Sequence, residues 1–345
     1  MKKLIIALLG IWILSSCKTN DLYKQVLNPA PVTIPPFVKK VGVLNRSIPT
    51  PDSKTYNTIH QIISGEGPEM IPQGSAEAIR GLKDALMANN RFEEIVLLPL
   101  PEAKGAAAGM VNSPLSWEQI DTLCRRYNVD AIFTLEMFDT QFKMNNILSQ
   151  VNPAHPVQGL MSAAPQISMA TTVKTTWRIY DPVNRIICDE FNLWHTLTFN
   201  GDGAGSILGT TDALAGRREA VKRTAYKVGN IYADRLRAYW ITITRQYYIK
   251  GNVAFKIAMR KARTGNWDGA AELWKNETNS PKRKIAGRAY YNMAIYNEIS
   301  SNLDAALDWA SKSYENYGNR LALRYVNILK NRKYKDGVLQ SQAPE

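Results

Sequence analysis

Hydrophobic and polar positions repeat with two different periods along the chain, and the changes of period predict a succession of strands and helices. A short apolar run at 39–45 follows charged and Pro-rich residues and predicts a buried strand. Apolar residues at three- and four-residue steps over 76–86 predict a helix, which Ser75 would cap. The run EIVLL at 94–98 predicts the next strand.

A second helix and a third strand are expected in the middle of the chain. Apolar positions repeat at helical spacing over 117–124, and Ser116 supplies an N-cap. Residues 130–142 then alternate as a strand. Two segments rich in Pro and small or polar residues, 46–74 and 144–170, predict a long loop and a long insertion.

The clearest hairpin in the sequence follows the insertion. Residues 171–180 alternate, 181–184 (DPVN) supply turn residues, and 186–199 return as the second strand. Apolar positions over 212–243 then recur at helical spacing and predict one long helix. The order strand, helix, strand, helix, strand, hairpin and long helix predicts an α/β domain with a mixed sheet.

The C-terminal region has a different pattern, made of similar short segments. KARTGNWDGAAELWKN at 261–276 aligns with NEISSNLDAALDWASK at 297–312, at about the tetratricopeptide period. The matched positions are Gly265 with Ser301, Trp267 with Leu303, and Ala270 with Ala306. This region resembles tetratricopeptide repeats, which implies stacked helix-turn-helix units with the alanines at helix contacts, and 320–334 as a third unit or a capping helix.

The N-terminus has the layout of a signal peptide. Lys2 and Lys3 precede an apolar core at 4–14, which at about 1.5 Å per residue would reach only about half of a ~30 Å hydrocarbon core. The last residues, LSSC, match the lipobox of bacterial lipoproteins. That resemblance implies that 1–17 are a signal peptide and that Cys17 becomes the acylated first residue, with palmitate among its lipids. An ordinary signal peptide that contains a cysteine is the alternative.

The residues after Cys17 bear on location. Lys18 stands where lipoproteins retained in the inner membrane usually have aspartate, so resemblance favours the outer membrane. Asp21 alone is acidic in the first residues, whereas surface-exported lipoproteins of some lineages carry an acidic cluster, so the periplasmic face is favoured over the cell surface. We expect 18–37, with four prolines, to be an extended tether. The predicted domains are then an α/β domain at 38–250 and helical repeats at 251–340.

Three stretches of this α/β region carry a further resemblance: VKKVGVLN, RRYNVDAIFTLEM and WRIYDPVNRIICDEF. With the closing helix, they resemble the periplasmic domain of curli-secretion pore lipoproteins and of lipoproteins that activate penicillin-binding proteins. The likeness covers 37–248 and implies the fold. The whole chain also resembles outer-membrane lipoproteins of Gram-negative, Bacteroides-type bacteria, and this resemblance implies no activity.

The net charge of +13 comes from the C-terminal part of the chain. Residues 1–211 hold 18 Lys and Arg against 18 Asp and Glu, whereas 212–345 hold 25 against 12. A basic region suits nucleic acid, but an exported protein without a nucleic-acid motif predicts no nucleic acid and favours an acidic protein or an anionic envelope component. Lys256, Arg260 and Arg263 share one helical side and are the candidate partner-binding residues, with a solvated face as the alternative.

Catalytic motifs are absent from the sequence. His60, His155 and His195 are scattered, and no HExxH, GxSxG or Cys/His metal spacing occurs. We therefore expect no catalytic residue, metal or cofactor. Cys124 and Cys188 are either two separate buried thiols or one disulfide.

The sequence as a whole favours a lipid-anchored cell-envelope binding or scaffold protein that is not an enzyme and presents basic helical repeats to a partner. The alternatives are an envelope hydrolase with a site in the α/β domain and a secretion or pore-associated lipoprotein. The oligomeric state is not predicted.

Overall fold

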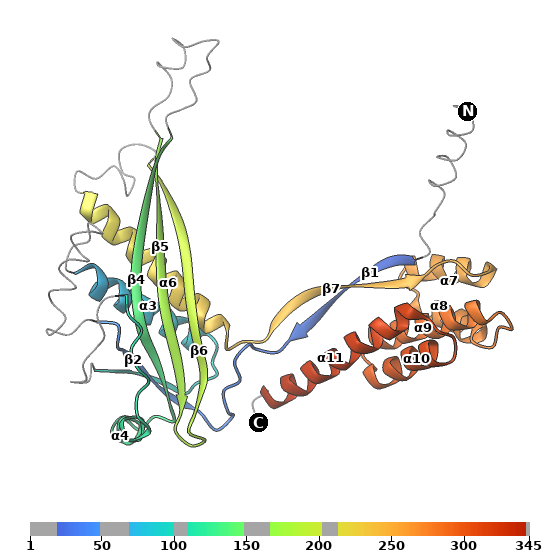
Figure 1. The fold of residues 1–345 in the computed structure, drawn as a ribbon, viewed down its shortest axis with the longest axis horizontal. Coiled ribbons are helices and arrows are strands. Elements are labelled where there is room, and N and C mark those ends of the chain that lie inside the picture. The colour runs from blue at the N-terminus through green and yellow to red at the C-terminus, as the bar shows by residue number, and fades with distance from the viewer. Residues whose placement is uncertain (1–18, 49–68, 100–108, 148–165, 202–212, 343–345) are drawn as a thin grey trace, which may run out of the picture. The chain divides into compact units, whose positions relative to one another are not determined.

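The computed structural model describes residues 19–48, 69–99, 109–147, 166–201 and 213–342 (Figure 1). The chain divides into two compact units, which we treat separately. The sheet unit is Ala30–Arg237 together with Gln342–Glu345, and the helical unit is Met1–Pro29 together with Ala238–Ser341.

The sheet unit contains a mixed five-stranded sheet in the order β3-β2-β4-β5-β6. Strand β2 runs parallel to β3 and β4, whereas β4 pairs antiparallel with β5, and β5 pairs antiparallel with β6. The long strands β4 to β6 are the green ribbons of Figure 1. The strands are β2 Lys40–Asn45, β3 Glu94–Leu98, β4 Ala131–Ile147, β5 Gln166–Asp181 and β6 Ile186–Gly201. The mixed sheet expected from the sequence is confirmed.

Helices cover both faces of this sheet. Helices α3 (Met70–Ala88) and α6 (Ala213–Asp234) pack on one face, and α4 (Trp117–Tyr127) packs against the other face. Alternation in β2 sends Val41 to the core under α3 and α6, and Leu44 to the core under α4. The two faces of β2 thus contribute hydrophobic side chains to two different cores.

Helices α3 and α6 approach each other closely at two glycines. A Cβ atom added to Gly81 would lie 2.1 Å from the backbone oxygen of Tyr226. One added to Gly229 would lie 2.0 Å from the backbone oxygen of Ala78. Both distances are far below van der Waals contact, so this packing requires residues without a side chain.

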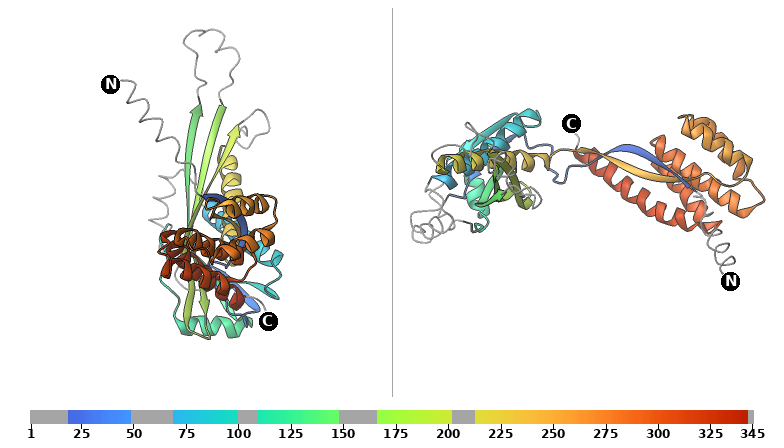
Figure 2. Two further views of the ribbon diagram at one scale, coloured as in Figure 1. Left: turned by 90° about the vertical axis from the view of Figure 1, so that its right-hand side faces the viewer. Right: turned by 90° about the horizontal axis from the view of Figure 1, so that it is seen from above.

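Within the described residues, the helical unit combines a two-stranded ribbon with helices α7 to α11 (Figures 1 and 2). Strands β1 and β7 pair antiparallel along ten residue pairs, from Thr19↔Tyr248 to Asn28↔Tyr239. Its core contains Trp274, Ala294 and Tyr325, which are at most 2% exposed. The elements are β1 Thr19–Asn28, β7 Tyr239–Tyr248, α7 Val253–Arg263, α8 Trp267–Glu277, α9 Arg283–Ile299, α10 Leu303–Glu315 and α11 Arg320–Gln342.

The tether expected at 18–37 is wrong for the part of it that the structure describes. Residues 19–28 form β1, and Val32 and Ile34 are buried in the core of the sheet unit. The prolines do prevent a regular element after Asn28, but the apolar residues between them pack against the sheet unit. The segment is therefore part of the fold.

The long helix expected at 212–243 is also wrong in its second half. Helix α6 ends at Asp234, and the sequence YWITITRQYY forms β7 instead. This segment has a β-branched run, ITIT, between aromatic residues, and such residues fit a strand better than a helix. The boundary between the two regions consequently falls near Arg237 and not at residue 250.

Two segments expected to lack regular structure are shorter than predicted. Helix α3 begins at Met70, so Ser75 is buried inside the helix and does not cap it. Strands β4 and β5 remain paired out to Ile147↔Gln166, inside the expected insertion, and 148–165 lie outside the described residues. The expected strands at 39–45 and 94–98 are confirmed, as are the hairpin and the helix capped by Ser116.

Candidate functional site

The structure places one part of the sequence-predicted site and leaves the other outside its described residues. Cys17 lies outside them. Lys256, Arg260 and Arg263 are all exposed on α7. Their spacing of four and three residues puts them on one side of the helix, as expected. We call these three residues the α7 basic face.

Helix α7, which carries this face, is capped at its first turn and packed against the unit on its other side. The side-chain oxygen of Asn252 accepts a hydrogen bond from the backbone N–H of Phe255 at 3.2 Å and caps the first turn. Phe255 and Ala258 are completely buried on the opposite side. Arg260 and Arg263 lie in the last turn, where positive charge complements the partial negative charge of the helix C-terminus. The α7 basic face is thus compatible with a stable helix and points to solvent.

A buried ionic cluster joins the ribbon to the helices of the same unit. Both carboxylate oxygens of Glu298 accept from the guanidinium of Arg245, at 2.7 and 2.8 Å, and the Tyr325 hydroxyl donates to the same carboxylate at 2.5 Å. Burial raises the pKa of Tyr325, and Glu298 beside it acts in the same direction. Every charge in this cluster has a partner, so it stabilises the contact of β7 with α9 and α11.

Lys24 of β1 closes the end of α9. Its Nζ donates to the backbone oxygens of Glu298 and Ile299 at 2.7 and 2.9 Å. Both are carbonyls of the last helical turn, where a cation is favourable. Burial lowers the pKa of Lys24 from its ordinary value. This lysine ties the N-terminal strand to the helical core.

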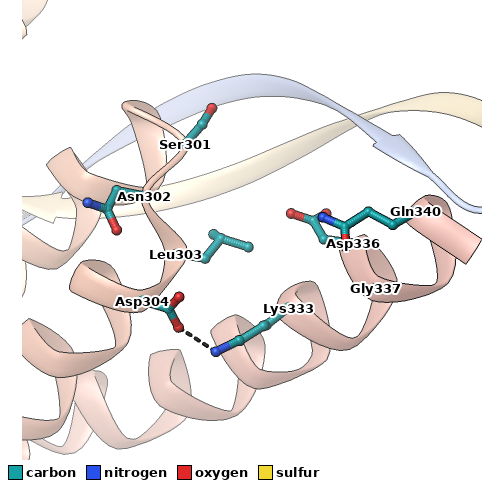
Figure 3. Close-up of a pocket in the computed structure, with 8 residues that line it drawn as sticks. All are labelled: Ser301, Asn302, Leu303, Asp304, Lys333, Asp336, Gly337 and Gln340. Carbon is teal, nitrogen blue, oxygen red and sulfur yellow. Dashed lines mark hydrogen bonds and ion pairs between the residues drawn. The ribbon is translucent and has the colours of Figure 1, made fainter.

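An open groove of about 540 Å³ lies between the start of α10 and the second half of α11 (Figure 3). An ion pair between Asp304 and Lys333 crosses it. Asp336 also pairs with Arg332 at 3.4 Å. The lining residues are Ser301, Asn302, Leu303, Asp304, Lys333, Asp336, Gly337 and Gln340. The lining contains no His or Cys and has its opposite charges paired, so it offers a polar recess and no catalytic constellation.

The sheet unit has its own buried carboxylate, Glu136. It is the extra residue of a β-bulge, where the pairing of β4 with β5 shifts between Leu135 and Met137. Its oxygens are contacted by Arg46 at 2.6 Å, by the Thr134 hydroxyl at 2.7 Å, and by the Tyr180 hydroxyl at 3.1 Å. Burial, with Glu136 nearby, raises the pKa of Tyr180. The Glu136 side chain is completely buried and both of its oxygens have partners, which is the pattern of a structural network.

Two cysteines and a histidine are further side chains that could take part in chemistry. Cys124 and Cys188 are free thiols, so the disulfide alternative is not realised, and burial raises the pKa of each to about 11. Burial lowers the pKa of half-buried His195, and Lys227 acts in the same direction. No group of three or more His, Cys, Asp or Glu within the described ranges could hold a metal ion. Within the same ranges, no helix is long and apolar enough to cross a membrane.

The sequence interpretation missed two exposed aromatic residues on one face of the ribbon. Tyr23 of β1 is 67% exposed and Trp240 of β7 is 68% exposed. Both lie on the face that carries the exposed residues of the two strands. The signal was the two-residue alternation in YWITITRQYY, which the helical interpretation of 212–243 overlooked.

Two family models match the chain, over ranges that do not overlap. The model "Domain of unknown function (DUF8603)" matches residues 38–248, more than half of the chain. The chain belongs to the DUF8603 family. The model "Domain of unknown function (DUF6340)" matches residues 256–331, all of which lie in the helical unit. The DUF8603 match contains the sheet unit from Val38 onward and also β7.

Further relatives of this DUF8603 protein are distant. No curated protein matches it. Two solved structures of PelC dodecamers from Paraburkholderia phytofirmans, one of them a single-substitution variant, are 12% and 13% identical to it. They cover 63% and 62% of this chain and 97% and 98% of those chains, with TM-scores of 0.25 and 0.23. TM-scores this low assign neither a fold nor a function to this chain.

Proposed function

We propose that this protein is a lipid-anchored binding or scaffold protein of the cell envelope, held in the outer membrane through acylated Cys17. The observation that carries the proposal is the α7 basic face. Three exposed cations share one side of a capped helix, in the unit whose first strand begins two residues after Cys17. Such a surface is complementary to an acidic protein.

We further propose that the helices of this unit are tetratricopeptide-like repeats. Gly265 and Ser301, the matched turn residues, both have positive φ angles, +82° and +62°. Ala270 and Ala306, matched at the helix contact, are both completely buried. Equal geometry at equal positions supports a repeated unit, and repeat stacks bind partners along exposed helix faces.

The anchor is tested by metabolic labelling with a fatty-acid probe. The natural chain should take up label and fractionate with outer membranes. The Cys17→Ala variant should take up none and leave the membrane fraction in a high-salt wash, because the acyl chains supply the salt-independent part of the membrane affinity. Label that persists on Cys17→Ala would exclude Cys17 as the lipidated residue.

The partner surface is tested by crosslinking in intact cells. Arg260→Glu combined with Arg263→Glu should abolish the crosslinked species that the natural chain forms. The matched control is Lys275→Glu with Lys330→Glu, which reverses two exposed cations on α8 and α11 of the same unit. Loss of the species in both variants, or in neither, would contradict a specific role of the α7 basic face; circular dichroism checks that each variant is folded.

A further inference from the structure

One end of the helical unit gathers positive charge from two helices. Four cations lie at the start of α9, and two lie at the start of α11. All except Arg288 are exposed. Segments 282–288 and 315–324 contain one acidic residue, Glu315. We call this surface the basic end, and its residues are Lys282, Arg283, Lys284, Arg288, Arg320 and Arg324.

Side-chain contacts hold these two helix starts together. The backbone oxygen of Gly287 in α9 accepts from the Ser313 hydroxyl at 2.7 Å and from Asn319 Nδ2 at 3.4 Å. Arg283 donates to the backbone oxygen of Asn316 at 2.6 Å. The cations of α9 and α11 therefore form one continuous surface, although more than thirty residues separate them in the sequence.

The positive charge of the basic end lies at the N-termini of α9 and α11, where it lowers helix stability. Helix N-termini carry partial positive charge and favour acidic residues, yet neither α9 nor α11 has an acidic residue in its first turn. Lys282, at the N-cap of α9, makes no side-chain capping hydrogen bond. Two helix N-termini and six cations with one nearby acid make a surface whose natural complement is an anion.

The same end is where the chain enters the fold from Cys17. Thr19, the first residue of β1, pairs with Tyr248 of β7. The Tyr248 hydroxyl donates to Asn319 at 3.1 Å, beside Arg320, and the Arg288 guanidinium lies over the Tyr248 ring at 5.0 Å. Cys17 precedes Thr19 by two residues, so covalent geometry keeps it within about 7 Å of the start of β1.

We propose that the basic end lies against the phosphate headgroups of the phospholipid bilayer that holds the acyl chains of Cys17. The inference rests on the proposed lipidation and adds to it the orientation of the helical unit. The short connection to β1 leaves no room for this unit to stand away from the bilayer. An acyl anchor and a polybasic surface reinforce each other, because each supplies part of the membrane affinity.

The test measures the basic end without the anchor. The chain from Lys18 to Glu345, which keeps every described residue, is sedimented with vesicles of phosphatidylcholine alone or mixed with phosphatidylglycerol. It should bind only the mixed vesicles, and more weakly as salt rises. Reversing three cations, Lys282→Glu, Lys284→Glu and Arg320→Glu, should weaken binding about a hundredfold, since one cation near an anionic surface contributes about fivefold.

The matched control reverses the same number of charges on the α7 basic face, Lys256→Glu, Arg260→Glu and Arg263→Glu. It should keep most of the vesicle binding, and circular dichroism confirms the fold of both variants. Equal losses in the two variants would overturn the proposal, because net charge would then explain binding. Unchanged binding after reversal at the basic end would also overturn it and would point to an acidic protein at this surface.

The outcome is separable from that of the proposed function. If Cys17 takes up no fatty acid but reversal at the basic end still abolishes vesicle binding, the anchor is wrong and the phosphate-binding surface stands. If Cys17 is labelled and the vesicles do not distinguish the variants, only the orientation proposed for the helical unit is wrong.

Discussion

Replacing Gly229 by alanine in α6 should destabilise the sheet unit, although alanine is the better helix former. The added Cβ would lie 2.0 Å from the backbone oxygen of Ala78, whereas ordinary contact begins at 3.4 Å. The two helix backbones must therefore separate by about 1.4 Å, the difference between these distances. Backbone atoms cannot rotate away as a flexible side chain can.

The magnitude follows from two opposing terms. Alanine gains about 1 kcal/mol over glycine in a helix interior. Overpacking a tight contact costs about 1–3 kcal/mol or more, and a clash between backbones belongs at the upper end. We therefore expect a net loss of about 2 kcal/mol. For a unit of this size, that corresponds to a fall in Tm of about 4–8 °C.

Differential scanning calorimetry, with urea denaturation followed by circular dichroism, measures this loss. Gly81→Ala should behave like Gly229→Ala, because its Cβ would lie 2.1 Å from the Tyr226 backbone oxygen. The matched control is Gly337→Ala in α11, where no atom lies within 4 Å of the added Cβ. That variant should gain about 0.5–1 kcal/mol. If Gly229→Ala is as stable as the natural chain, the close approach of α3 and α6 is refuted.

Two further predictions concern buried charge and buried thiols. Glu298→Gln should cost about 3–5 kcal/mol in urea denaturation, because it leaves the buried Arg245 guanidinium without its counter-charge, and adding Arg245→Met should recover much of the loss. The pKa of Cys124 and of Cys188 is raised from 9.0 to about 11 on folding, so their contribution is present below pH 9 and is lost as pH rises from 9 to 11. The free energy of unfolding should therefore fall over this window, and less steeply in a Cys124→Ala, Cys188→Ala variant; an equal slope in both proteins would contradict this assignment.

Much of the sheet unit could be predicted from patterns of neighbouring residues. Strand β3 and helix α4 lie where the sequence predicts them, because each is specified by neighbouring residues. In α4, the Ser116 hydroxyl and the Gln119 side chain close a capping box that fixes the first turn. In the hairpin of β5 and β6, Asp181 accepts from the backbone of Val183 and Asn184, so the turn is made within four residues.

Of the two candidate surfaces, the α7 basic face and the basic end, one could be predicted from the sequence and the other could not. The α7 basic face could be predicted, since its three residues lie within one short helix and their spacing alone puts them on one side. The basic end could not, because its cations come from the starts of two helices that only the contacts of Gly287 with Ser313 and Asn319 bring together.

Short sequence patterns were enough to predict most elements, the separation of a sheet-forming part from a helical part, and the position of the excess charge. The pairing of 19–28 with 239–248 and the end of α6 at Asp234 depend on contacts between distant segments, which such patterns do not contain. In a two-stranded ribbon, each strand makes its ladder hydrogen bonds with the other strand alone, which here lies more than two hundred residues away. Periodicity within a short window shows which residues could form such a strand, but the choice between strand and helix is made by the partner that satisfies its backbone.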